Sequence, residues 1–323
     1  DFLTDNRATL ESLRQGLAAR HGLSADVAIS ELQRHLLAKF RVELGTQGLG
    51  AILEAYQKER DAVLAFVRKR DLFPVPEGQE MKILRTPTFL EPTIPAGAMM
   101  SPPPFREGVR TSIVYLTLSE ALVDEHSRLG IPGMIIHEGI PGHHLQLTHA
   151  ALHDSVIRRH CDAMELAEGW TTMLEDYMLD VGYMGELSDE ARFIGKLDIA
   201  RIGARVGIDL FFMTGEPSFL ELGVVSPPTE GDAFARAGHV LREVTGFVPG
   251  RVEAELNWYS IERGYPLSYL AGNHLVHQLK ADVEKKAGAA GLDVDRRFHR
   301  SFLEAGNMPV ESLRKVFAHQ QLI

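Results

Sequence analysis

Apolar residues recur at helical spacing through the first 70 residues of the chain. Leu10 and Leu17 belong to one run with intervals of three and four, which is typical of a helix with one buried face. A second run with this spacing extends from Ile52 to Phe66. The pattern predicts three helices between residues 6 and 70, followed by a proline-containing loop.

The pattern changes between residues 80 and 118. Residues 82–85 and the β-branched and aromatic run at residues 111–118 predict two short strands. The prolines between them are Pro87, Pro92, Pro95, Pro102, Pro103 and Pro104. They predict a long loop without helix. Because long loops inside compact domains often cover functional sites, we expect this loop to lie over one.

From residue 119 onward the periodicity is helical almost throughout. The predicted helices cover residues 119–128, 132–151, 155–181, 189–214, 230–245, 250–284, 293–304 and 309–321. Gly215, Pro217 and Pro227 mark the clearest helix ends. The sequence therefore predicts a mainly α fold with a small β element beside the helices.

Composition and charge exclude several classes of protein. The chain has 323 residues, of which 34 are Lys or Arg and 44 are Asp or Glu, so its net charge is −10. Without a basic cluster, this balance argues against nucleic acid or an anionic membrane as a partner. The single cysteine, Cys161, excludes an intramolecular disulfide and a four-cysteine zinc site.

The sequence also contains no signal for membrane insertion. We find no stretch of about 18 uncharged apolar residues and no basic-then-apolar signal peptide. We therefore expect no membrane insertion of this chain. Its compartment and oligomeric state stay open.

Five of the 14 histidines fall within residues 134–153. A His-Glu pair followed closely by another histidine is what a zinc hydrolase needs, because imidazoles hold the ion and the carboxylate takes a proton from water. His137, Glu138 and either His143 or His144 are the candidates. The remaining two histidines, His149 and His153, lack a supporting motif and are interpreted as surface residues.

The spacing of these histidines requires an interrupted helix. On an ideal helix His143 lies about 9 Å along the axis from His137, and His144 about 10.5 Å. Metal–nitrogen distances of about 2.0 to 2.1 Å do not allow a shared ion across either gap. Pro141 cannot donate a backbone hydrogen bond, and Gly142 permits an unusual backbone. We expect a two-residue excursion at residues 139–141 that brings His143 beside His137; otherwise these are ordinary core or surface histidines and Pro141 is a simple kink.

A third ligand is expected on the next helix. Glu168 is the best candidate, because Gly169 after it allows helices to approach closely and Trp170 can form a wall of the site. Glu165 and Glu175 are candidates for orienting a ligand histidine. The alternative is that these carboxylates form a solvated acidic helix face.

At these residues the sequence resembles a known family. HEGIPGHHLQ at residues 137–146, followed by EGW at residues 168–170, resembles the signature of the bacterial family called domain of unknown function 885. The motif is also similar to that of the gluzincin peptidases related to thimet oligopeptidase and neurolysin, which carry His-Glu-x-x-His and a more distant glutamate. The resemblance implies a zinc metallopeptidase in which Zn2+ is bound by His137, His143 and Glu168, with Glu138 as the general base. Glu168 lies 25 residues after His143, as the resemblance requires, and this favours His143 over His144.

The resemblance extends over residues 103–279 and implies that the chain is the C-terminal part of a longer family member. It implies an N-terminal helical segment at residues 1–79 and a gluzincin-like catalytic domain at residues 80–323, continuous with one another. Residues 201–209 match an Arg-x-x-x-Asp helix of the family, which contains Arg205 and Asp209. Residues 255–272 match the segment that contains Tyr269 and Gly272.

Three positions depart from the family pattern. Trp258 stands where arginine is common, Arg263-Gly264-Tyr265 replaces Pro-Gly-Gln, and Met213 replaces a histidine. The departures leave the metal ligands intact and put conserved substrate recognition in doubt.

Further residues are candidates for contact with the substrate. Tyr265 and Tyr269 lie one helical turn apart, so both can face the site and donate to an oxyanion; the alternative is a helix-helix seam. His144 is a candidate substrate-binding residue. Arg205 is another, although an internal i,i+4 pair with Asp209 is slightly favoured. We also expect the strand at residues 111–118 to lie at a sheet edge, where a peptide can pair with it.

The leading hypothesis is a zinc-dependent peptidase that cleaves short peptides with Glu138 as general base. A second hypothesis keeps the metal and the base but changes the substrate to a small non-peptide amide or carbonyl compound. A third is a catalytically inactive helical interaction protein, in which Pro141 prevents a working site. The choice of metal also stays open, because two histidines and a glutamate accept other divalent ions.

Overall fold

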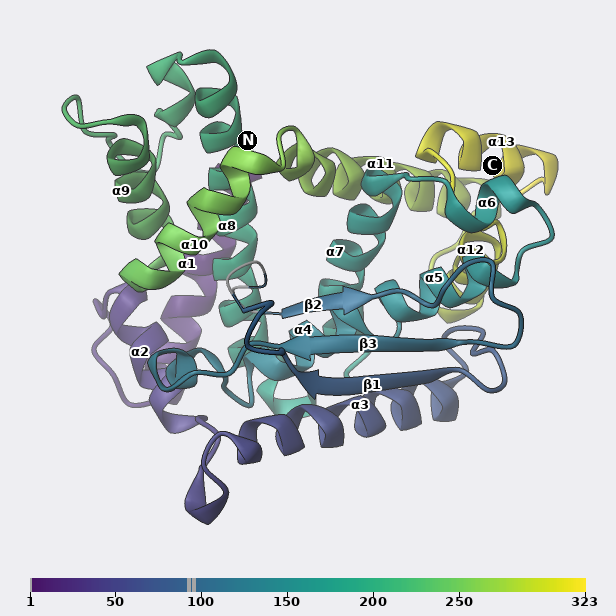
Figure 1. Ribbon diagram of the computed structural model, residues 1–323, viewed down its shortest axis with the longest axis horizontal. Coiled ribbons are helices and arrows are strands. Elements are labelled where there is room, and N and C mark those ends of the chain that lie inside the picture. Colours follow the sequence, from purple (N-terminus) through teal and green to yellow (C-terminus); the bar gives the residue numbers. More distant parts are fainter. Residues whose placement is uncertain (1, 92–93, 95–96) are drawn as a thin grey trace.

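The structure is a computed structural model that describes residues 2–91, 94 and 97–323. Helices form most of the molecule, and a small three-stranded sheet lies along one side of them (Figure 1). The prediction of a mainly α fold with a small β element is confirmed.

The three predicted N-terminal helices are α1 (Phe2–Arg20), α2 (Ile29–Lys39) and α3 (Gly50–Arg70). Leu17 of α1 and Leu36 of α2 are buried in a core with Phe193 of α8. By contrast, Val67 of α3 is buried in the large central core, which also contains Ile83 of the sheet. The first 79 residues thus contribute to two different cores.

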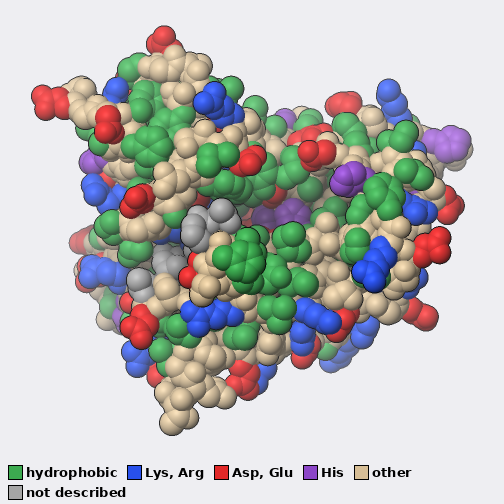
Figure 2. Space-filling model, in the orientation of Figure 1, with side chains coloured by type: hydrophobic (Ala, Val, Ile, Leu, Met, Phe, Trp, Pro, Cys, Tyr) green, Lys and Arg blue, Asp and Glu red, His purple; other side chains and the backbone are tan. Residues whose placement is uncertain are grey.

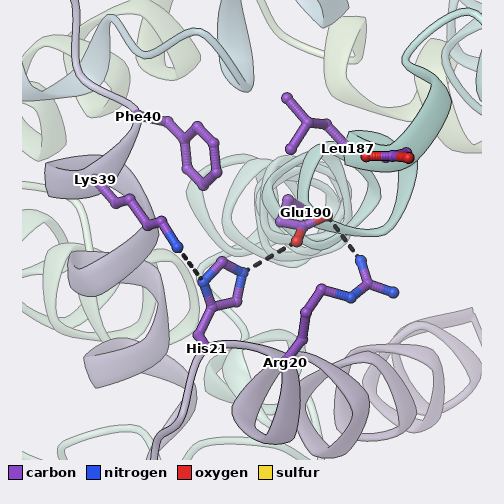
Figure 3. Close-up of a pocket in the computed structure, with 7 residues that line it drawn as sticks. Arg20, His21, Lys39, Phe40, Leu187 and Glu190 are labelled. Atoms are coloured by element: carbon purple, nitrogen blue, oxygen red, sulfur yellow. Dashed lines mark hydrogen bonds and ion pairs between the residues drawn. The ribbon is translucent and has the colours of Figure 1, made fainter.

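A polar network fastens α1 and α2 to the start of α8 (Figure 3). It lies at a surface hollow of about 500 Å3. The buried carboxylate of Glu190 accepts a hydrogen bond from Arg20 at 3.0 Å and lies 3.0 Å from Nε2 of His21. The other ring nitrogen of His21 lies 3.0 Å from Nζ of Lys39. Because these groups bond to one another, we assign the network a structural role.

The sheet consists of β1 (Glu80–Arg85), β2 (Gly97–Met100) and β3 (Thr111–Leu116) in the order β1-β3-β2. β1 runs parallel to β3 and β2 runs antiparallel to it. The predictions of β1 and β3 are confirmed. β2 lies inside the segment that was predicted to be a loop. The sequence did not reveal this strand, because its four residues are too few to show a periodicity. Two prolines of that loop, Pro92 and Pro95, lie outside the described residues.

The predicted addition of a peptide strand to β3 is wrong. β3 is the central strand, and its backbone groups are paired with β1 on one side and with β2 on the other. Over residues 113–116 both edges of β3 are therefore occupied by described strands, and a peptide cannot pair with it there.

The helices after the sheet agree with the periodicity in position but not always in length. They are α4 (Gly130–Glu138), α5 (His143–Leu152), α6 (Val156–His160), α7 (Met164–Asp180), α8 (Ser188–Thr214), α9 (Ala233–Thr245), α10 (Pro249–Ile261), α11 (Tyr265–Ala287), α12 (Leu292–Glu304) and α13 (Val310–His319). Short 3-10 helices lie at Gly45–Gln47, Glu120–Glu125, Gly185–Leu187 and Pro217–Leu220. Three predictions are corrected. The predicted helix at residues 119–128 contains a 3-10 helix, and those at residues 155–181 and 250–284 are each divided in two.

The division between α10 and α11 has a local cause. Gly264 has φ +78°, a left-handed conformation that a helix interior does not accommodate and that glycine adopts without strain. α11 therefore begins anew at Tyr265, where Pro266 in the first turn lacks the N–H that would have no partner there.

Helix α7 lies at the centre of the large core. Its Trp170 is fully buried and stacks on Phe302 of α12, with the ring centroids 4.4 Å apart. α8, α9 and α10 share a second core that includes Ile208, Val240 and Leu256. No helix in the described part of the chain combines the length and the apolar character that a membrane crossing requires.

Candidate metal centre

The histidine motif lies at a break between two helices. α4 ends at Glu138 and α5 begins at His143, with a cis peptide bond between Ile140 and Pro141. The predicted interruption is confirmed, and it extends over residues 139–142. Gly142 is required at its end, because a Cβ atom there would overlap the carbonyl oxygen of His137.

A hydrogen bond from α7 stabilises this break. Nε1 of Trp170 donates to the carbonyl oxygen of Pro141 at 3.0 Å. Trp170 has 0% of its surface exposed. It therefore holds the break in place from the core and does not form a wall of the site, contrary to the prediction.

The break brings His143 back beside His137, as predicted. The two rings are nearly perpendicular, with centroids 5.0 Å apart. Glu168 of α7 lies against both: its Oε2 is 3.4 Å from Nε2 of His137 and 3.6 Å from Nε2 of His143. One ligand atom from each of the three residues lies within 4.8 Å of the other two. Three side chains from α4, α5 and α7 thus present a compact His2Glu cluster.

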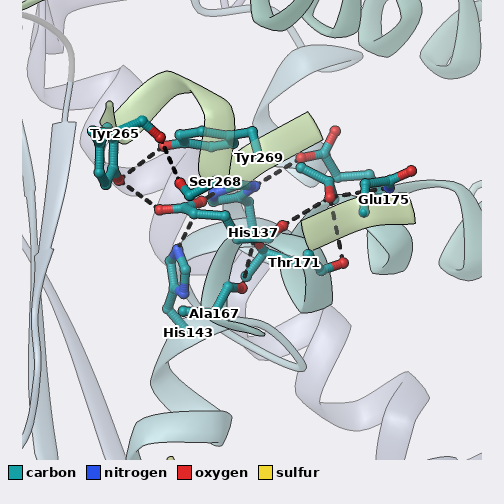
Figure 4. A network of polar contacts seen from close by, with 12 residues as sticks. His137, His143, Ala167, Thr171, Glu175, Tyr265, Ser268 and Tyr269 are labelled. Carbon is teal, nitrogen blue, oxygen red and sulfur yellow. Dashed lines mark hydrogen bonds and ion pairs between the residues drawn. The ribbon is translucent and has the colours of Figure 1, made fainter. Parts of the chain in front are cut away.

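Glu175 orients the first histidine, as predicted (Figure 4). Its Oε1 lies 2.8 Å from Nδ1 of His137, so that nitrogen can donate to Glu175 while Nε2 faces Glu168. Burial disfavours the charged form of His137, but Glu168 and Glu175 outweigh it and raise the pKa of His137 well above its ordinary value. Burial raises the pKa of Glu175.

The two oxygens of Glu168 have different partners. Oε1 accepts a hydrogen bond from the Tyr265 hydroxyl at 2.5 Å, whereas Oε2 has no hydrogen-bond donor among the described residues. Burial opposes ionisation of Glu168, but His143 and His137 hold the pKa of this carboxyl well below its usual range. A buried carboxylate oxygen that faces two imidazoles matches the donor set of a zinc site.

His137, His143 and Glu168 are therefore the residues that could hold a divalent cation.

The prediction that Glu165 orients a histidine is wrong, because its Oε1 accepts from the backbone nitrogen of Val310 at 3.3 Å.

His144 points away from this cluster. Its Nδ1 lies 2.7 Å from Oγ of Ser112 on β3, and its Nε2 lies 2.5 Å from Oε1 of Gln79. The ring is fully buried, and burial lowers the pKa of His144 to about 4. His144 is thus bonded to the sheet and not to the candidate metal ligands. Because the ring is fully buried, it has no exposed surface with which to contact a substrate, contrary to the prediction.

The other two histidines of the motif have local partners. Nε2 of His149 lies 2.9 Å from the carbonyl oxygen of Pro74. This ring is half-buried and not at the surface, contrary to the prediction. Nδ1 of His153 accepts from the backbone nitrogen of Ser155 at 2.9 Å, just after the end of α5.

Tyr265 and Tyr269 both reach the cluster, as their spacing predicted (Figure 4). Their hydroxyl oxygens lie 3.0 Å apart, and the Tyr269 ring stacks on His137 with centroids 6.3 Å apart. Burial raises the pKa of both phenols, so both hydroxyls keep their protons and remain donors.

Arg205 and Asp209 form no ion pair, so the favoured internal pairing is wrong. The Asp209 carboxylate accepts from the backbone nitrogen of Gly264 instead, at 3.0 and 3.2 Å. Arg205 turns toward aromatic rings of α10 and α11. One of these rings, Tyr259, was not predicted to lie at the site; its one signal in the sequence was its place beside the unusual Trp258.

Figure 2 shows histidine side chains near the middle of one face of the molecule, next to hydrophobic side chains. The fold and this cluster define a mainly helical protein with a candidate divalent-metal centre at a broken helix. The chain belongs to the bacterial family of proteins of unknown function DUF885, whose profile matches residues 4–316. No curated protein matches the sequence.

Two solved structures are similar in fold. One is “the putative lipoprotein from Colwellia psychrerythraea”, with a TM-score of 0.79 and 18% identity, covering 99% of this chain and 51% of that one. The other is “a putative lipoprotein of unknown function from Shewanella oneidensis”, with a TM-score of 0.73 and 16% identity, covering 98% of this chain and 54% of that one. The chain spans about half the length of both, and the likeness concerns the fold alone.

Proposed function

We propose that the protein is a zinc-dependent hydrolase and that its substrates are short peptides. The observation that carries this proposal is the convergence of His137, His143 and Glu168 around one buried carboxylate oxygen without a donor. This donor set is the one that catalytic zinc sites with two histidines and a glutamate use. A divalent cation held there would make a water molecule more acidic and would polarise a substrate carbonyl group.

Glu138 is the general base of this proposal. It follows His137 at the end of α4, it is half-buried, and its negative charge acts on His137. Within the described part of the chain its carboxylate forms no hydrogen bond or ion pair. It is therefore available to accept a proton from the attacking water and to pass it to the leaving nitrogen.

The two tyrosines supply hydrogen-bond donors. Tyr265 donates its one hydroxyl proton to Glu168, so the Tyr269 hydroxyl donates to Tyr265. Burial keeps Tyr269 protonated, and in this proposal its proton turns from Tyr265 to the oxyanion that develops at the attacked carbonyl. Tyr265 donates to Glu168 and so holds this carboxylate in its orientation.

The choice of peptides rests on the resemblance of the motif to peptidases. A small non-peptide amide or carbonyl substrate is the second candidate, and one contact favours it. Trp258, which departs from the family pattern, packs against Tyr265 with ring centroids 5.2 Å apart. The departure therefore lies where a substrate would be recognised.

Metal analysis of three proteins tests the proposal: the wild type, Glu138→Gln and His143→Ala. We expect about one zinc per chain in the wild type and in Glu138→Gln, and a loss of zinc in His143→Ala. A digest of a peptide library should show cleavage by the wild type alone. Zinc without cleavage of any peptide favours the second candidate, and absence of zinc from the wild type contradicts the proposal.

A further inference from the structure

A buried arginine without a polar partner lies close to the candidate metal centre. Arg205 belongs to α8 and has 1% of its surface exposed. None of its three guanidinium nitrogens has a hydrogen-bond partner among the described residues. An arginine carries five N–H donors and stays charged, so burial without a partner is costly.

Four aromatic rings surround this guanidinium. Its Cζ atom lies 4.9 Å from the ring centroid of Trp258, 4.7 Å from that of Tyr259, 5.8 Å from that of Tyr265 and 4.9 Å from that of Tyr269. Cation–π attraction stabilises the charge inside such a cage. It does not satisfy the N–H donors of the guanidinium, which have no hydrogen-bond partner among the described residues.

The carboxylates nearby already have other partners. Glu255 lies 2.7 Å from Arg251 and 3.7 Å from Arg201, and Asp209 accepts from the backbone nitrogen of Gly264. Both carboxylates are buried and lie close enough for the charge of Arg205 to act on them, but neither accepts a hydrogen bond from its guanidinium. The N–H donors of Arg205 therefore still lack an acceptor, and the two oxygens of a further carboxylate would supply one.

One layer of aromatic rings separates Arg205 from the metal ligands. Tyr269, which contacts Arg205, also stacks on His137, and Tyr265 bonds to Glu168. A residue of an extended peptide spans about 3.3 to 3.6 Å. A carboxylate bound by Arg205 would therefore belong to a residue roughly one or two positions after a bond held at the metal ligands.

We propose that Arg205 binds the free C-terminal carboxylate of the substrate, so that the protein removes one or two residues from the C-terminus of short peptides. This inference rests on the proposed hydrolase function. Trp258 and Tyr265 are the half-buried members of the cage, whereas Tyr259 and Tyr269 are buried, so the carboxylate enters past the first two. Inside the apolar cage a bidentate arginine–carboxylate pair is stronger than in water.

A binding measurement tests this assignment without turnover. The probes are acetyl-trialanine with a free carboxylate and the same peptide with a C-terminal amide, titrated by calorimetry into zinc-loaded Glu138→Gln protein. We expect the free acid to bind about 10- to 100-fold more tightly than the amide. Combining Arg205→Met with Glu138→Gln should remove this preference for the free acid. Arg205→Lys in the same background should retain part of it, because lysine keeps the charge but not the planar guanidinium group.

Two controls separate a binding role from a structural role. Methionine suits the apolar cage, so thermal melts of Arg205→Met should show a folded protein with unchanged or higher stability. Arg201→Met removes a half-buried arginine of α8, one that has the carboxylate partners Asp198 and Glu255. It should lower the melting temperature and leave the preference for the free acid intact.

The outcomes for Arg205 and for the hydrolase function are distinct. Equal binding of acid and amide, or a preference that survives Arg205→Met, overturns the assignment of Arg205 even if the wild type cleaves peptides. A preference that depends on Arg205, in a protein that cleaves no peptide, supports the assignment while the peptidase proposal fails.

Discussion

Gly169 of α7 and Gly272 of α11 lie in direct backbone contact. A Cβ atom on Gly169 would lie 2.9 Å from Cα of Gly272, and one on Gly272 would lie 3.0 Å from the nitrogen of Gly169 and would overlap the carbonyl oxygen of Glu165. Such a contact exists only between residues without side chains. It sets the distance between the helix that carries Glu168 and the helix that carries Tyr269.

We therefore predict that Gly272→Ala separates these helices. The methyl group overlaps backbone atoms, which cannot turn aside, so the free energy of unfolding should fall by about 1–3 kcal/mol or more. Zinc affinity should fall with it, because the tyrosines move relative to Glu168. Chemical denaturation and zinc titration measure the two effects.

Gly195→Ala is the matched control for this change. Gly195 also lies inside a helix, but a Cβ atom there has no neighbour within 4 Å. Its replacement should stabilise the protein by roughly 0.5–1 kcal/mol, because glycine is a poor helix former. Equal effects of the two substitutions would contradict the role assigned to the helix contact.

The sequence predicted this contact only in outline. Gly169 suggested a close approach, but its partner lies on α11, about a hundred residues later, and spacing along the chain does not identify it. The same limit explains the error at Arg205. Its i,i+4 spacing from Asp209 favours an ion pair between the two side chains. In the folded chain the Asp209 carboxylate instead accepts a hydrogen bond from the backbone nitrogen of Gly264, which is distant in sequence.

Local signals were more reliable. The distance between His137 and His143 required a broken helix, and Pro141 with Gly142 showed where the break lies. The direction of His144 was not predictable, because it depends on Ser112 of β3, which reaches the ring only through the tertiary structure. For the same reason the sequence showed β3 as a strand but not as the central one.

The second prediction distinguishes His143 from His144 as a metal ligand. His143→Ala should lose zinc, since it removes one of three ligands. His144→Ala should keep about one zinc per chain but lose stability, because it leaves Ser112 and Gln79 without their buried partner. Elemental analysis and thermal melts of both variants decide the matter. Loss of zinc in His144→Ala alone would reverse the assignment.

The third prediction concerns Glu175. Glu175→Gln weakens the contact that fixes the ring of His137, so zinc affinity should fall by about 10- to 100-fold. Asp176→Asn is the control, since Asp176 bonds to Arg192 and Lys196 at the surface of the helix pair. It should leave zinc affinity unchanged. Competition with a zinc chelator measures both, and equal losses would remove the special role of Glu175.

The last prediction concerns stability in acid. Burial lowers the pKa of His299 to about 3 and that of His126 and His144 to about 4. These histidines are neutral in the folded protein, whereas in the unfolded chain they take up protons below about pH 6.5. Their contribution to stability is therefore complete above about pH 6.5 and is lost as the pH falls toward 4 and then 3.

Replacing one of these histidines should reduce that loss. His299→Gln keeps a donor for the carbonyl oxygen of Leu72 but cannot take up a proton. Its stability at pH 7 should be lower than that of the wild type, while its decline between pH 6.5 and pH 4 should be smaller, by roughly 1.4 kcal/mol per unit of pH. Urea unfolding of the metal-free protein across this range measures the decline. His319→Gln, at an exposed position, should follow the wild type, and an identical decline in His299→Gln would show that His299 does not titrate on unfolding.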